Sequence, residues 1–195
     1  MRATEMREES AVEKPRQLSL RSGVGLLLAL LSFPGCHASP ARGETIHLTS
    51  ASFQGDKMPS KFTCDGAGIS PQLAWYAPPA GTASFALIVA DPDAPLRTFV
   101  HWVIYDLPAT SRALPEAMPA QGQLADGSRQ GRNDFDNLGY GGPCPPGHSP
   151  HHYVFTVYAL DTKLNLPPGA SQAQVDAAMR GHVLASGVLI GLYNR

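Results

Sequence analysis

Three short segments of this 195-residue sequence carry side chains that could bind an anion or move a proton. They are Asp91-Pro-Asp-Ala-Pro95, His101-Trp102, and the stretch 139–153, in which glycines and prolines precede His148, His151, His152 and Tyr153. Carboxylates that follow a buried strand must be paired, hydrogen-bonded or next to a cavity, because an isolated buried charge is very unfavourable. Histidine can donate to an anion when protonated, and its pKa lies near ambient pH. These residue types therefore predict a polar pocket.

Strand periodicity places several of these side chains on shared faces. Alternation along the third segment puts His151 and Tyr153 on one face of a strand. The same alternation puts His101 on the face of Val103. His151 and Tyr153 could then line one pocket together, and His101 could join them if its strand lies beside that of Asp91.

The glycines of residues 139–147 favour contact between bare backbone and a ligand. They do not form a dinucleotide-binding motif, since no strand precedes them, no helix follows and prolines intervene. Adjacent glycines allow backbone N–H groups to approach an anion closely. A plain irregular loop is the alternative.

Short apolar runs bounded by turn residues predict the strands that position these segments. The runs are 44–50, 72–76, 84–90, 99–107, 153–160 and 182–193. Three of them (84–90, 99–107 and 153–160) are apolar on both faces, which is typical of strands inside a sandwich. A capping box at Ser171 and Gln174 predicts one helix that ends before Gly181. The excess of predicted strands over predicted helices favours an all-β sandwich with a peripheral helix. In the connection 109–139 the apolar residues show no strong periodic pattern.

The N-terminal segment has the features of an export signal. A ten-residue apolar run, 24–33, follows Arg16 and Arg21 and is about half as long as a membrane-spanning helix. It leads into Cys36 in a pattern that resembles a bacterial lipoprotein cleavage site, at which the cysteine is acylated. Cleavage near Ala38 and plain secretion is the alternative.

These features predict an exported protein, in the periplasm or anchored to the bacterial envelope by lipid on Cys36. The predicted parts are a signal peptide over 1–35, a linker over 36–44 and one domain over 45–195. If Cys36 carries lipid, Cys64 and Cys144 remain. An even pair of cysteines in an oxidising compartment permits one disulfide, and two free buried thiols are the alternative.

Composition and motifs exclude several classes of function. The net charge is −1 and only 16% of residues are charged, so we expect no nucleic-acid partner. Nucleophile and phosphate-loop motifs are absent from the sequence, so we expect neither an enzyme nor a cofactor. A metal site, and with it a metal-dependent hydrolase, stays an alternative, because zinc-ligand residue types occur without a helical or cysteine-pair spacing. Those residues are Asp91, His101, His148, His151 and His152.

Taken in order, the motifs resemble those of the phosphatidylethanolamine-binding protein family, most closely its bacterial, Raf-kinase-inhibitor-like branch. The matching segments are D-P-D-A-P, then H-W, then G-Y-G-G-P-C-P-P-G followed by H-x-Y, with Thr63-Cys-Asp-Gly66 and Asn133-Asp-Phe135 in support. The resemblance runs from about residue 45 to the C-terminus.

The resemblance implies a two-sheet antiparallel β-sandwich with one or two peripheral helices near the C-terminus and a small anion pocket. Such a pocket accepts phosphate, acetate-like anions or phospholipid head groups. The matching pocket positions are Asp91, His101, Gly142, Pro143, His151 and Tyr153, with Gly141 as an alternative to Gly142. His152 stands where an arginine is common, and His148 is an additional imidazole. The resemblance thus implies a binding protein, one that could modulate an envelope enzyme or, like eukaryotic members, inhibit a kinase or protease through its surface.

Overall fold

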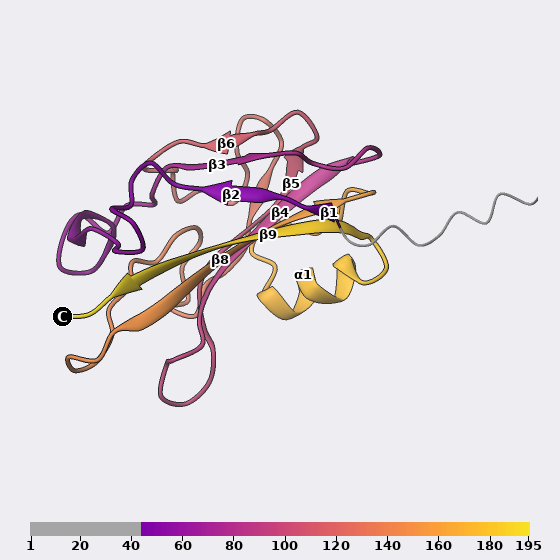
Figure 1. Cartoon of the computed structure of the whole chain (residues 1–195). Helices are drawn as coiled ribbons and strands as arrows, with labels where there is room; N and C mark the ends of the chain where they lie inside the picture. The colour runs from indigo at the N-terminus through magenta and orange to yellow at the C-terminus, as the bar shows by residue number, and fades with distance from the viewer. Residues whose placement is uncertain (1–43) are drawn as a thin grey trace, which may run out of the picture. The chain divides into compact units, whose positions relative to one another are not determined.

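Two β-sheets form the computed structural model, which describes residues 44–195 (Figure 1). The larger sheet consists, in order, of β1 (Glu44–Thr45), β9 (Val183–Tyr193), β8 (His151–Leu160), β4 (Ser84–Asp91), β5 (Phe99–Pro108) and β7 (Arg129–Gln130). The smaller sheet consists of β2 (His47–Thr49), β3 (Leu73–Tyr76) and β6 (Ala113–Leu114). All strand pairs are antiparallel except β1 with β9. The predicted two-sheet antiparallel sandwich is therefore confirmed.

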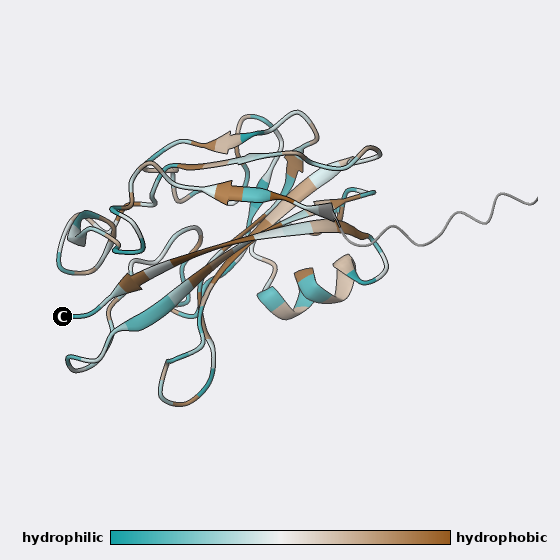
Figure 2. Ribbon diagram, in the orientation of Figure 1, coloured by the Kyte–Doolittle hydropathy of each residue, from teal (hydrophilic) through white to brown (hydrophobic). Residues whose placement is uncertain are grey.

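The central strand β4 is buried on both faces. Phe85 and Leu87 belong to the main core between the sheets, together with residues of β5, β8 and β3. Ala86 and Ile88 belong to a second cluster on the other face, which the helix α1 (Gln172–Met179) covers. Figure 2 shows that α1 carries both hydrophobic and hydrophilic residues. Burial on both faces explains why the sequence of β4 is apolar without alternation.

The helix α1 begins at the predicted capping box. The backbone N–H of Gln174 donates to Ser171 Oγ (3.3 Å), and the backbone N–H of Ser171 donates to Gln174 Oε1 (2.9 Å). Val175 and Met179 are the buried residues of its inner face. Within residues 44–195, no helix is both long and apolar enough to cross a membrane.

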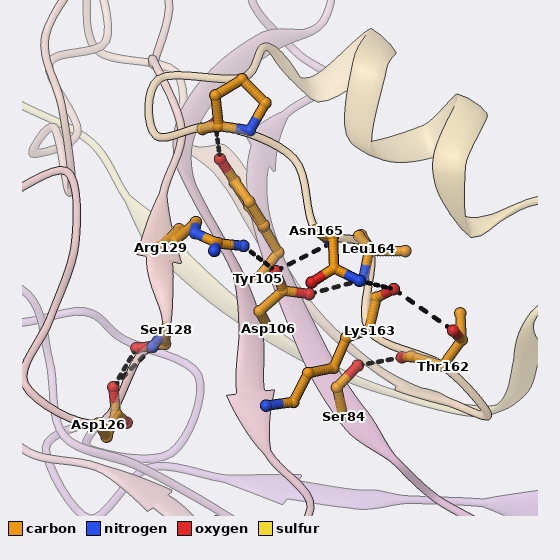
Figure 3. Close-up of polar contacts among 11 residues, drawn as sticks. Ser84, Tyr105, Asp106, Asp126, Ser128, Arg129, Thr162, Lys163, Leu164 and Asn165 are labelled. Atoms are coloured by element: carbon orange, nitrogen blue, oxygen red, sulfur yellow. Dashed lines mark hydrogen bonds and ion pairs between the residues drawn. The ribbon is translucent and has the colours of Figure 1, made fainter.

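A buried carboxylate connects β5 to the segment before α1 (Figure 3). Asp106 has a positive φ of 56° and accepts a hydrogen bond from Arg129 Nη1 (2.7 Å). It also accepts from the backbone N–H groups of Leu164 (2.7 Å) and Asn165 (3.1 Å). Leu164 packs against the second core cluster, so Asp106 fixes the chain that covers the outer face of the large sheet.

Candidate functional site

A cavity of about 190 Å³ lies at one end of the large sheet. Four of the predicted pocket residues line it: Asp91, His101, His151 and Tyr153. Asp91 ends β4, whereas the other three lie at the beginnings of β5 and β8. Because β4 is antiparallel to both neighbours, its last residue lies beside their first residues. The remaining lining residues are Ala94, Pro95, Phe99, Phe135, Cys144, Pro145 and Pro146.

Asp91 and His151 form a buried pair in this cavity. His151 Nδ1 lies 2.7 Å from Asp91 Oδ2, and the backbone N–H of Asp93 donates to Asp91 Oδ1 (2.8 Å). The carboxylate fixes the ring orientation of His151, since Nδ1 carries the proton that it accepts. Nε2 of His151 is therefore the ring nitrogen left for a ligand.

The second carboxylate of the 91–95 turn, Asp93, is hydrogen-bonded to the next histidine along β8, His152. Asp93 Oδ2 accepts from the backbone N–H of His152 and lies 2.8 Å from its Nδ1. The backbone N–H, followed by the ring, holds the pKa of Asp93 below its usual value. His152 points to the opposite side of the strand from His151 and is exposed, so it does not line the cavity.

The predicted alternative of a metal site is not supported by the arrangement of these histidines. His148 Nδ1 lies 3.0 Å from the carbonyl oxygen of Arg195, away from the cavity lining. Within the described part of the chain, no three His, Cys, Asp or Glu side chains gather as a metal would require.

A β-bulge turns His101 into the cavity. In the β4–β5 ladder Val89 pairs with Trp102 and Ala90 pairs with Val100, so His101 is the extra residue. The prediction that His101 shares a face with Val103 is wrong for this reason, since a bulge breaks the alternation of side chains. Val103 lies in the second cluster on the outer face, whereas the ring of His101 contacts Tyr153 edge-on with centroids 5.2 Å apart.

Hydrogen bonding and burial fix the tautomer of His101. Its Nδ1 lies 2.8 Å from the carbonyl oxygen of Gly141, whose N–H donates to the carbonyl of His101 (2.7 Å). A carbonyl can only accept, so Nδ1 carries the proton. Burial lowers the pKa of His101, which makes the ring neutral at ambient pH. The expectation that both histidines offer N–H groups to an anion therefore changes: His101 Nε2 presents a lone pair.

The lowered pKa of His101 predicts that the fold is sensitive to acid. A histidine that is neutral in the folded state binds its proton more readily in the unfolded state. The contribution of neutral His101 to the free energy of unfolding is complete above about pH 6.5, the ordinary pKa of histidine. This contribution is lost as the pH falls towards the lower pKa that His101 has in the folded state. We expect the melting temperature to fall less between about pH 7.5 and pH 5 in His101→Asn than in the wild type. An equal fall in both proteins would contradict this assignment.

The hydroxyl group of Tyr153 is buried and makes no hydrogen bond of normal geometry with a described residue, although the Asp91 carboxylate lies close enough to act on it. Burial, with the negative charge of Asp91 as a second cause, raises the pKa of Tyr153, so the group stays a neutral donor. Buried polar atoms are nearly always hydrogen-bonded in folded proteins. A hydroxyl without a hydrogen bond of normal geometry on the lining of a cavity therefore indicates where a ligand atom is expected.

An aromatic wall, formed by Phe99 and Phe135, closes one side of the cavity. Phe135 comes from the connection 109–139, in which apolar residues show no strong periodic pattern. Asn133 fixes its turn: the side-chain oxygen accepts from the Phe135 N–H (3.0 Å) and the amide donates to the carbonyl of Gly139 (3.0 Å). A Cβ at Gly141 would lie 2.4 Å from the Phe135 ring, so only glycine fits there without displacing this wall.

Another part of the lining is a proline wall, formed by Cys144, Pro145 and Pro146. The predicted wall residues Gly142 and Pro143 do not line the cavity but lie behind this segment, where the carbonyl of Pro143 accepts from the Cys64 N–H (2.9 Å).

A disulfide joins Cys64 to Cys144, with Cα atoms 5.4 Å apart, and attaches the proline wall to the loop that precedes β3. The motif Asn133-Asp-Phe135 and the prolines of 139–147 were the sequence signals that could have identified both walls.

The fold and the site define a protein of the phosphatidylethanolamine-binding class. The sequence profile of the family described as "Phosphatidylethanolamine-binding protein" matches residues 49–194. The chain therefore belongs to this family, as the resemblance of its motifs indicated.

Individual relatives extend over most of the same region. A UPF0098 protein of Aquifex aeolicus is 49% identical over 158 residues, which cover 80% of this chain and 92% of the relative. UPF0098 protein YbhB of Escherichia coli is 42% identical over 149 residues, covering 72% of this chain and 94% of the relative. The crystal structure of E. coli YbcL, described as a new member of the mammalian PEBP family, matches with a TM-score of 0.73 and 36% identity. That match covers 78% of this chain and 99% of YbcL.

The prediction of an exported protein in the periplasm or bacterial envelope is contradicted by these comparisons. A relative from Methanothermobacter thermautotrophicus is 53% identical over 139 residues, and one from Pyrococcus horikoshii is 43% identical over 181 residues. Both organisms are archaea, so membership of this family does not place a chain in a bacterial envelope. The prediction depended on residues 1–35 and Cys36 alone, and these lie outside the described residues.

Proposed function

We propose that the cavity binds a small oxyanion, either free phosphate or the phosphate of a phospholipid head group. The observation that carries this proposal is the buried Tyr153 hydroxyl, which makes no hydrogen bond of normal geometry and lies on the same lining as the Asp91–His151 pair. A ligand oxygen at this position would accept from the hydroxyl and from His151 Nε2 when that ring is protonated. The proposal is for binding and not for catalysis, in keeping with a family described as a binding protein.

The size of the cavity supports a small ligand. Its volume of about 190 Å³ is below the ~300–1,000 Å³ that is usual for sites of drug-sized ligands. A phosphate group with a short substituent fits this space, whereas the acyl chains of a lipid would have to remain outside. The aromatic and proline walls would contact the substituent, and the polar residues would contact the phosphate.

Isothermal titration of the full chain with phosphate and with phosphoethanolamine tests the proposal. We expect saturable binding that His151→Ala weakens at least ~10-fold, since hydrogen bonds to charged groups contribute about 1.5–3 kcal/mol. His152→Ala is the matched control: it changes the next residue of the same strand, whose ring points away from the cavity, and binding should stay within about twofold. Tighter binding of phosphoethanolamine would favour a head group as the source of the phosphate. No heat from either ligand in the wild type, or equal binding by both variants, would contradict the proposal.

A further inference from the structure

The charges around the cavity are unusual for an anion site. Its lining holds one carboxylate, Asp91, but no lysine or arginine. The arginines nearest in sequence to the cavity lining have acidic partners of their own: Arg97 pairs with Asp134 (2.7 Å) and Arg132 with Asp136 (3.1 Å). A doubly charged anion would therefore meet a negative charge at close range without a permanent cation to offset it.

The ring of His101 adds an acceptor to this lining. Nδ1–H is used by the carbonyl of Gly141, so the neutral ring has only the lone pair of Nε2 left for a ligand. The charged or titratable groups that act on it are Asp91 from β4, His151 and Tyr153 from β8, and Asp134 from the 109–139 connection. Burial, the largest effect, lowers the pKa of His101; the hydrogen bond to Gly141 and the charges of Asp91 and Asp134 act in the other direction, and the net effect is a neutral acceptor. The Tyr153 hydroxyl is a donor of the site whether or not the His151 ring is protonated.

We propose that the cavity selects oxyanions that carry their own proton, such as the monoanion of phosphate or of a phosphate monoester or phosphonate. This inference rests on the proposed function and adds to it the protonation state of the ligand. The P–OH group of the ligand donates to His101 Nε2, while another oxygen accepts from the Tyr153 hydroxyl. An anion without a proton leaves the His101 lone pair facing an oxygen lone pair, in a site whose neighbouring carboxylate is also negative.

Two ligands of similar shape and equal charge test this selection. Near pH 6.5, the ordinary pKa of histidine, methylphosphonate is mainly a monoanion with one P–OH group, and methanesulfonate is a monoanion without a proton. We expect titration of the full wild-type chain to give at least ~10-fold tighter binding of methylphosphonate, because an unsatisfied buried acceptor is strongly unfavourable. Equal affinities would overturn the inference and leave the proposed function intact. Binding of neither ligand, together with no binding of phosphate, would overturn both.

The variant His101→Asn tests whether the acceptor on His101 causes the preference for methylphosphonate, rather than some other difference between phosphonate and sulfonate oxygens. Asparagine can keep an N–H near the carbonyl of Gly141 but has no atom in the place of Nε2. We expect the preference for methylphosphonate to fall to within about threefold, with methanesulfonate bound no more weakly than by the wild type. Asp91→Asn keeps an acceptor for His151 and leaves the His101 ring in place, so the preference for methylphosphonate should persist. Persistence of the full preference in a folded His101→Asn protein would contradict the role of His101.

Discussion

Replacing Asp106 by alanine is expected to lower the free energy of unfolding by about 3 to 5 kcal/mol. The side chain is 3% exposed and accepts from Arg129 and from two backbone N–H groups. Alanine would leave both N–H groups unsatisfied, at about 1–3 kcal/mol each, and would leave Arg129 without its partner. It would also have to adopt the positive φ of 56°, which asparagine, aspartate and glycine tolerate better. Chemical denaturation of the purified variant measures this loss.

Two further variants distinguish the buried contacts from the strained backbone. Asp136 also has a positive φ, of 67°, and an arginine partner, but its side chain is 86% exposed. Asp136→Ala should therefore lower the free energy of unfolding by no more than about 1–2 kcal/mol, which is the cost of the left-handed backbone conformation alone. Asp106→Asn keeps one oxygen acceptor and the tolerance of positive φ, so its loss should lie between those of the two alanine variants. Equal losses in the two alanine variants would show that backbone conformation, and not the buried carboxylate, dominates.

The sequence predicted the long strands well because their apolar runs report burial directly. The runs at 84–90 and 153–160 correspond to β4 and β8, and their lack of alternation reflects two covered faces. The capping box at Ser171 predicted the beginning of α1 because both of its hydrogen bonds are local. The motif resemblance and the period-two alternation along β8 together predicted that Asp91, His151 and Tyr153 line one pocket.

The position of His101 could not be predicted by the same reasoning. Alternation assigns it to the outer face, and a single extra residue in the β4–β5 ladder moves it to the inner face beside Tyr153. A bulge depends on pairing between two strands and has no signal in one strand alone. The aromatic wall is a similar case, since Phe135 reaches the cavity through a turn held by Asn133 in an otherwise irregular connection.

Loss of the Cys64–Cys144 disulfide is expected to lower the free energy of unfolding by about 4 kcal/mol. The bond closes a loop with a sequence separation of 80 residues, and a cross-link of that span removes much of the conformational entropy of the unfolded chain. Denaturation with and without a phosphine reductant measures the effect in a Cys36→Ser background, in which only these two cysteines can pair. The double variant Cys64→Ser with Cys144→Ser should show the lower stability and no response to reductant. A Cys36→Ser protein that is equally stable with and without reductant would contradict the expected stabilisation.

The same bond should matter for ligand binding, because it holds one wall of the cavity. Cys144 lines the cavity, whereas Cys64 lies in the loop that follows the 3₁₀ helix Ser60–Phe62. Without the bond, the proline wall keeps the backbone contact from Cys64 N–H to the Pro143 carbonyl but gains freedom that binding must then remove. We expect phosphate affinity to fall about 3- to 10-fold in the double variant at a temperature at which it is fully folded. Unchanged affinity together with reduced stability would mean that the backbone contact alone positions the proline wall, and that the disulfide acts only on the unfolded chain.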